Sequence, residues 1–408
     1  MSIPPLFRCP ISLDLFTDPV TLCTGQTYDR PSIEKWLADG NHTCPVTMQR
    51  LHDFTMVPNS TLRRMIDHWL LMDSQVDLQH LRSIDPDLSL AALKTQLQSQ
   101  HHHPTTTLLA RTQTVRIIRT LSQESDIRRA CLIRLGFLPL LLQLLFCSQP
   151  PNLTSQHAEF AEEALECLLS LLSLSCTRRL ASLNLLLKEA SSLASFHFLL
   201  EQGSMKIKTS LCLLVHTISS AAETRDLCFM LGQTRPILRH LVSLIRQNSD
   251  QCASNAAMKA IAGMCSLEQN RDNVIREGGV DGILSYLADQ DQGGAGDGAA
   301  AAALETLEVL LVLGSGKRDA ISNPSSVPVL VKFVFRVSDL ECSESAVSSL
   351  LLMCSESTGI RAEAISCGAL RQLLLLLQSQ CNGRAKNKAR VLLKLLRSIR
   401  AADANTST

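Results

Sequence analysis

Two Cys-Pro pairs near the N-terminus come closer to metal chemistry than other residues of this sequence. Cys9-Pro10-Ile11-Ser12 and Cys44-Pro45-Val46-Thr47 each have one thiol where a Cys-x-x-Cys pair would have two, and Cys23 and His42 lie between them. Two closed zinc sites would need four thiolate or imidazole ligands each. Three Cys and one His are too few. The spacing therefore predicts the frame of a two-zinc domain that binds no metal.

Short elements are predicted between the two pairs. Residues 20–22 and 26–28 flank a turn at Cys23-Thr24-Gly25, which is typical of a small hairpin. Asp29 is a good N-cap for a helix that ends at Gly40. Three apolar residues, spaced three or four apart, give this helix an inward face, and they are Ile33, Trp36 and Leu37.

A second helix is predicted after a loop over residues 42–58. Asn59 or Ser60 can cap it, and one of its faces carries Leu62, Met65, Ile66 and Trp69. Residues 1–76 also hold seven of the 15 Pro residues, a density that indicates short loops and turns. The sequence thus separates a small N-terminal domain from the rest of the chain.

The N-terminal domain resembles the U-box family. The strings that carry the resemblance are Ile3-Pro4-Pro5-Leu6-Phe7-Arg8-Cys9-Pro10-Ile11-Ser12, Asp18-Pro19-Val20, Gly25-Gln26-Thr27-Tyr28-Asp29-Arg30, Ile33-Glu34-Lys35-Trp36, Cys44-Pro45-Val46-Thr47 and Val57-Pro58-Asn59. The resemblance implies a small α+β, zinc-free, RING-like domain. It also implies a ubiquitin ligase that binds a ubiquitin-charged conjugating enzyme and forms no covalent intermediate with ubiquitin.

The same resemblance supplies the candidate site. It places conjugating-enzyme contacts at Ile11 and Leu13 on the first loop, Trp36 on the first helix and Pro45 on the second loop. Ile11 and Trp36 could instead be core residues. Met48 stands where many such ligases have an Arg that bridges the conjugating enzyme and ubiquitin, and Gln49 or Arg50 could substitute for it.

Polar side chains are expected to take over the structural role of zinc, because buried polar groups without partners are costly. The residues expected to form this network are Asp18, Thr24, Thr27, Asp29, Arg30, Thr47 and Asn59. No metal and no other cofactor is expected in this domain. Farther along the chain, His101-His102-His103 could bind a metal, although a polar linker is the favoured interpretation.

From about residue 106 the sequence repeats. A Leu-rich helix recurs after a small or polar residue, with later copies at steps of about 44 residues, the period of armadillo and HEAT repeats. The recurring segments begin near Leu135, Leu231, Glu277, Asn323 and Cys367. A second helix is predicted in each unit, over residues 161–174, 210–220, 255–266, 301–314, 344–355 and 387–400. Stacked helix pairs make one continuous core, which predicts an α-solenoid rather than an irregular bundle.

The predicted fold class is therefore mainly α. A U-box at 1–76 is expected to be followed by a helical and polar linker at 77–105, an armadillo-type solenoid at 106–400 and a disordered tail at 401–408. A U-box followed by such repeats is similar to the plant U-box ubiquitin ligases. That similarity implies that the repeats recruit a protein substrate. The alternative is a non-catalytic adaptor with a degenerate U-box.

Composition limits the partners. The formal net charge is +1, which does not favour nucleic acid as a partner. The Leu-rich runs are too short to span a bilayer, and the N-terminus lacks a secretory signal pattern. Most of the 15 Cys lie in apolar helical patterns, as in a reduced intracellular protein. We therefore expect a cytoplasmic protein without an integral membrane segment, and a homodimer is left open.

Overall fold

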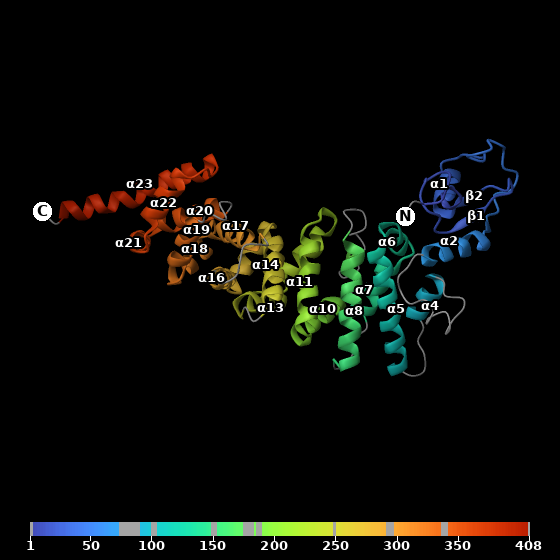
Figure 1. The fold of residues 1–408 in the computed structure, drawn as a ribbon, viewed down its shortest axis with the longest axis horizontal. Coiled ribbons are helices and arrows are strands. Elements are labelled where there is room, and N and C mark those ends of the chain that lie inside the picture. Colours follow the sequence, from blue (N-terminus) through green and yellow to red (C-terminus); the bar gives the residue numbers. More distant parts are fainter. Residues whose placement is uncertain are drawn as a thin grey trace. The chain divides into compact units, whose positions relative to one another are not determined.

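The computed structural model describes residues 3–72, 90–98, 104–147, 153–173, 183–184, 190–247, 250–290, 298–335 and 342–406. The chain divides into two compact units, Met1–Leu185 and Leu186–Thr408, and each is described by itself. The first holds a small sheet-containing domain and a set of helices, and the second is helical in all its named elements (Figure 1). The predicted mainly α class is confirmed.

The N-terminal domain is built around a three-stranded antiparallel sheet with the order β2-β1-β3. The strands are β1 (Pro19–Thr21), β2 (Thr27–Asp29) and β3 (Val57–Pro58). Val20 lies opposite Tyr28, and Thr21 lies opposite Thr27, so the predicted hairpin is confirmed with a shift of one residue. Gly25 has φ +77°, which suits glycine in the tight turn between the strands.

Two helices flank this sheet. Helix α1 (Arg30–Ala38) buries Ile33 and is followed by Gly40 at φ +85°, as predicted. Helix α2 (Ser60–Met72) begins as predicted, because the Asn59 side chain accepts a hydrogen bond from the Leu62 N–H at 3.0 Å. Its inner face differs from the prediction, since Met65 is exposed.

The other elements described in the first unit are helices. They are α4 (Leu90–Gln98), α5 (Pro104–Glu124), α6 (Asp126–Arg134), α7 (Phe137–Phe146) and α8 (Ser155–Leu172). Helix α5 packs along α8, and α7 is buried over most of its length. The histidine tract at 101–103 lies outside the described residues.

The second unit starts with the helix pair α10 (Ala190–Gln202) and α11 (Met205–Ser219) and continues with groups of three helices. These groups are α12 (Arg225–Gln233), α13 (Arg235–Gln247) and α14 (Gln251–Cys265); α15 (Glu268–Arg276), α16 (Gly279–Asp289) and α17 (Ala299–Leu311); α18 (Gly314–Ser322), α19 (Ser326–Val334) and α20 (Cys342–Glu356); and α21 (Thr358–Ser366), α22 (Ala369–Gln378) and α23 (Gly383–Thr406). The last helix of each group packs on the last helix of the next, from α11 through α14, α17 and α20 to α23 (Figure 1).

The sequence predicted helix pairs, whereas most repeats of the second unit have three helices. The additional helix of each group is its first, only nine residues long, and α15 is the most polar of them. The apolar stripe of each such first helix is too short to give a recognisable helical period in the sequence. Tertiary packing must therefore stabilise the helix. Helix α23 also runs to Thr406, into the segment predicted to be a disordered tail.

The glycine that precedes several Leu-rich helices has a structural reason. Gly278 and Gly368 have φ values of +81° and +85°, in the left-handed region that favours glycine. Each one ends a short helix, and its N–H donates to the carbonyl three residues earlier, Ile275 or Ile365. The recurring sequence motif therefore marks the sharp corner between the first and second helices of a repeat.

One further property concerns the lengths of the helices. No single helix in the described ranges is both long enough and apolar enough to cross a membrane. Two bent pairs, α6 with α7 and α17 with α18, meet the criteria of length and composition only when taken together.

Candidate functional site

The two Cys-Pro segments of the N-terminal domain fold into loops of the same backbone shape. In the first, the Leu13 N–H donates to the Cys9 carbonyl at 2.9 Å, and in the second the Met48 N–H donates to the Cys44 carbonyl at 2.9 Å. Leu13 and Met48 both have φ 59°. They are the only non-glycine residues with a positive φ in the described part of the chain. This left-handed conformation disfavours most side chains, so the fold must hold each loop in place.

Strand-like pairing closes each loop at its base. Arg8 pairs with Leu15 below the first loop, and Thr43 pairs with Arg50 below the second. The Cys9 N–H donates to the Asp14 carbonyl at 2.8 Å, as the Cys44 N–H does to the Gln49 carbonyl at 2.9 Å. Both loops are thus tied at tip and base by backbone hydrogen bonds.

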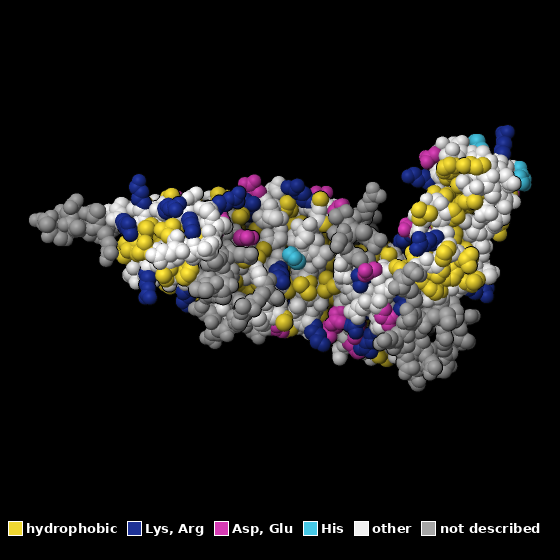
Figure 2. Space-filling view, turned by 45° about the horizontal axis from the view of Figure 1, so that its top comes forward, with side chains coloured by type: hydrophobic (Ala, Val, Ile, Leu, Met, Phe, Trp, Pro, Cys, Tyr) yellow, Lys and Arg dark blue, Asp and Glu magenta, His cyan; other side chains and the backbone are white. Residues whose placement is uncertain are grey.

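Apolar side chains lie at the tips of these loops. Ile11 and Pro45 are half-buried, whereas Leu13 and Met48 are exposed at 67% and 72%. Val46 is exposed as well. Figure 2 shows hydrophobic side chains gathered on the N-terminal domain, the lobe at the upper right. Exposed apolar groups on a rigid frame are what a protein-binding surface requires.

Trp36 connects helix α1 to the second loop. Its indole Nε1 donates to the Thr43 carbonyl at 2.9 Å, next to the buried Cys44. The Asn41 amide in turn donates to the Trp36 carbonyl at 3.1 Å. Trp36 is half-buried, and Ile33 is the residue of its helix that faces the core. Trp36 therefore has a structural contact whether or not it also touches a partner.

Asp29 organises the first loop from a fully buried position. Its Oδ1 accepts hydrogen bonds from the Thr17 and Asp18 N–H groups, both at 2.7 Å, and its Oδ2 accepts one from the Thr17 hydroxyl at 2.8 Å. Its own N–H donates to the Cys9 thiol at 3.3 Å. The expectation that Asp29 caps helix α1 is wrong for its side chain, which turns back to this loop instead.

Cys44 organises the second loop in a similar way. Its sulfur is fully buried and receives hydrogen bonds from the Thr24 hydroxyl at 3.4 Å and the Tyr28 hydroxyl at 2.9 Å. The Val46 N–H donates to the Tyr28 oxygen at 3.2 Å. Burial by itself raises the pKa of Cys44, but the hydrogen bonds, led by that of Thr24, outweigh it and lower the pKa to about 6. Burial and the bond to Cys44 in turn raise the pKa of Tyr28.

This shift predicts a pH dependence of stability. The pKa of Cys44 in the folded domain, about 6, lies below its ordinary value of 9.0, so the thiolate stabilises the fold fully above pH 9 and loses this effect as the pH falls toward 6. We expect the free energy of unfolding to rise by on the order of 4 kcal/mol over this window.

Urea denaturation at several pH values can measure this rise through Trp fluorescence, because both Trp residues, Trp36 and Trp69, lie in this domain. Cys44→Ser removes the titrating thiol and keeps a hydrogen-bonding side chain of similar size. An equal rise in this variant would show that other groups cause the pH dependence.

Other members of the expected polar network pair at the edges of the sheet. Arg30 Nε donates to Asp18 Oδ2 at 2.6 Å, and the Asn59 amide donates to the hydroxyls of Thr27 at 3.2 Å and Thr21 at 3.4 Å. Hydrogen bonds of this kind join loop, sheet and helix. The absence of zinc from the domain itself remains a prediction.

The remaining two residues of the incomplete ligand set are exposed. Cys23 is exposed with its sulfur 3.9 Å from His52 Nδ1, and the exposed His42 packs on Phe54. Sequence reasoning missed the roles of Cys9, Cys44 and Tyr28 as hydrogen-bonding groups of the network. The Cys-Pro pairs themselves could have indicated these roles. A thiol retained without a metal can still accept hydrogen bonds.

Two families match the chain, and together they cover most of it. Residues 3–75 match the U-box domain, and residues 89–404, more than half of the chain, match the plant U-box protein ARM repeat region. The chain belongs to the plant U-box proteins with ARM repeats. The family resemblance predicted from the sequence is thereby confirmed, while the predicted domain boundaries remain predictions.

Relatives of this U-box protein align along nearly its whole length. U-box domain-containing protein 26 of Arabidopsis thaliana is 34% identical over 406 residues, covering 97% of this chain and 92% of the relative. U-box domain-containing protein 25 of the same plant is 32% identical over 404 residues, with the same two coverages. The Arabidopsis E3 ubiquitin-protein ligase PUB23 is 27% identical over 404 residues, covering 97% of this chain and 93% of that protein.

Proposed function

We propose that this U-box protein is an E3 ubiquitin ligase. Its U-box docks a ubiquitin-charged conjugating enzyme through Ile11, Leu13, Trp36 and Pro45, and its ARM repeats recruit the protein substrate. The observation that carries the proposal is the matched pair of loops, which hold half-buried Ile11 and Pro45 beside exposed apolar tips. The name of one relative, E3 ubiquitin-protein ligase PUB23, supports the reaction class.

The loops suit docking because they are held in shape before a partner binds. Backbone hydrogen bonds at tip and base fix both of them, so little conformational entropy is lost on association. A few apolar residues seated in a partner's groove can then supply most of the binding free energy. Ile11 follows Cys9 by two residues and Pro45 follows Cys44 directly, so each loop presents an apolar contact near its tip.

Transfer in this proposal needs no nucleophile from the ligase. The ligase brings the thioester of the conjugating enzyme close to a substrate lysine, and rate comes from proximity and orientation. The full burial of Cys9 and Cys44 agrees with this mechanism, since neither loop thiol is accessible to ubiquitin.

Substrate recruitment is assigned to the ARM repeats because stacked repeats expose a continuous row of helices to a partner. In the second unit this row includes the helices α17, α20 and α23. Lys388 of α23 reaches Glu344 of α20 at 3.1 Å and Glu308 of α17 at 3.3 Å. Charged groups along one row are suited to a polar protein segment. Cytoplasmic residence and the absence of a nucleic-acid partner stay predictions.

Autoubiquitination with a panel of charged conjugating enzymes tests the proposal. We expect ubiquitin chains or adducts with at least one of them, and none when the U-box is deleted. The absence of product with every conjugating enzyme, in reactions where another plant U-box ligase is active, would instead favour the non-catalytic adaptor.

Met48 gives a second, more specific test of the ligase. Its exposed side chain leaves the second loop at the place assigned to a ubiquitin clamp, where methionine offers no hydrogen-bond donors. We expect Met48→Arg to raise the rate of ubiquitin discharge from the conjugating enzyme several-fold, in single-turnover assays. Met48→Gln is the matched control, because it adds polarity without charge. A rate unchanged by Met48→Arg would remove Met48 from the clamp position and leave Gln49 or Arg50.

A further inference from the structure

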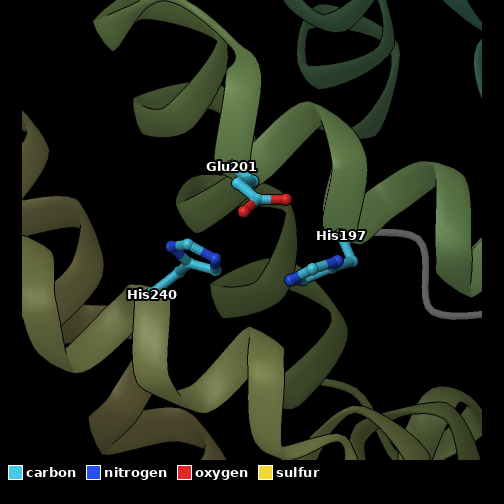
Figure 3. Close-up of side chains that lie close together, drawn as sticks. All are labelled: His197, Glu201 and His240. Atoms are coloured by element: carbon cyan, nitrogen blue, oxygen red, sulfur yellow. The ribbon is translucent and has the colours of Figure 1, made fainter.

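Three side chains of the second unit that could bind a metal converge between two neighbouring helices. His197 and Glu201 lie one helical turn apart on α10, and His240 lies on α13, which packs against α10. Their nearest ligand atoms all lie within 4.8 Å of one another. Figure 3 shows the two imidazoles and the carboxylate directed toward a common space. No other group of three such residues occurs in the described chain.

The donor set favours one class of metal. Two imidazole nitrogens and one carboxylate oxygen are ligands that Zn²⁺ accepts readily, at bond lengths of about 2.0–2.2 Å. In a tetrahedral site of that size, neighbouring ligand atoms are roughly 3.3 Å apart. Small rotations of the half-exposed His197 and His240 and the exposed Glu201 can close the remaining gap.

The charges around the cluster are compatible with a cation. Burial and the neighbouring His197 lower the pKa of His240. Lys208 and Arg239 are the positive groups that act on His240, and they oppose a cation. Arg239 is partly neutralised, because its Nε lies 3.2 Å from Glu277. Glu201 supplies the negative charge within the cluster itself.

We propose that His197, Glu201 and His240 form a binding site for a Zn²⁺ ion. The ion joins α10 of one repeat to α13 of the next. Three protein ligands leave a fourth position for water or for a donor group of a bound protein. The site fastens two successive repeats at a point where the rings of His197 and His240 already pack on each other, with their centroids 5.2 Å apart. It lies within the ARM repeats, and it does not depend on ligase activity.

The test uses the full chain with His101→Ala, His102→Ala and His103→Ala, because that tract could bind metal on its own. Zn²⁺ is titrated into the metal-free protein, and Co²⁺ is the spectroscopic probe. We expect one ion per chain, with visible bands of a four-coordinate Co²⁺ and without the sulfur-to-metal band of a thiolate site. We also expect a higher unfolding temperature with Zn²⁺ than without it.

Variants then locate the ion. His240→Ala is expected to weaken Zn²⁺ binding at least a hundredfold, and Glu201→Gln, which keeps the size of the side chain, at least tenfold. His216→Ala is the control, because His216 lies in the same unit outside the cluster; circular dichroism verifies that each variant is folded. The proposal is overturned if the parent chain binds no ion, if binding survives His240→Ala, or if thiolate bands dominate the spectrum.

Discussion

Replacing Ile11 or Pro45 by alanine is expected to abolish ubiquitin transfer and leave the protein folded. Both side chains are half-buried at the tips of loops whose shape depends on backbone hydrogen bonds. Truncation therefore removes apolar area that contacts the conjugating enzyme, without removing a hydrogen bond that holds the fold. Residues at the centre of such interfaces contribute about 2 kcal/mol or more, which corresponds to a loss of roughly thirtyfold in affinity for the conjugating enzyme.

Affinity for the conjugating enzyme and single-turnover ubiquitin discharge measure this effect. Met65→Ala is the matched control, because Met65 is an exposed apolar residue of helix α2 and belongs to neither loop. Normal transfer by Ile11→Ala and Pro45→Ala would move the docking surface elsewhere. Trp36→Ala is a less decisive variant, since it also removes the hydrogen bond to Thr43 and so lowers the stability of the second loop.

The N-terminal fold could be predicted because its signals are local. The turn at Gly25, the end of a helix at Gly40 and the cap at Asn59 each depend on a few adjacent residues. The direction of the Asp29 side chain could not be predicted in that way. Its acceptors can serve a helix N-terminus or the loop at Thr17, and the choice depends on how the hairpin brings residues 17 and 29 together.

Contacts between elements far apart in sequence were also outside the reach of local patterns. The prediction of ARM repeats rested on recurring Leu-rich segments, and it succeeded because each repeat buries an equivalent apolar face. The short first helices have too short an apolar face to recur visibly in the sequence, although α12 buries Leu227 and Leu231. The cluster of His197, Glu201 and His240 has no local sequence pattern, because His240 lies 39 positions after Glu201 and only the packing of α13 on α10 brings them together.

Asp29→Ala is expected to lower the free energy of unfolding of the U-box by roughly 3–5 kcal/mol, a large part of a typical domain's stability. The substitution leaves the Thr17 and Asp18 N–H groups and the Thr17 hydroxyl without their acceptor in a partly buried place. Asp29→Asn retains one carbonyl oxygen for the two N–H groups, so we expect a smaller loss. Urea denaturation followed by Trp fluorescence measures both.

Asp18→Ala is the matched control for the charge. The Asp18 carboxylate is about half exposed and pairs with Arg30, and an exposed ion pair of this kind contributes about 1 kcal/mol or less. If Asp29→Ala unfolds at the same urea concentration as Asp18→Ala, the buried carboxylate is not what holds the first loop.

The two sets of variants together separate docking from folding. The Asp29 carboxylate holds the segment that follows the first loop through Thr17 and Asp18, so its loss should reduce stability and, through the displaced Ile11, ubiquitin transfer as well. Ile11→Ala should reduce transfer alone. The loops of this U-box depend on hydrogen bonds to a carboxylate and a thiol. Removing such a buried acceptor should therefore lower both stability and ubiquitin transfer, whereas removing an apolar side chain at a loop tip should lower only the affinity for the conjugating enzyme.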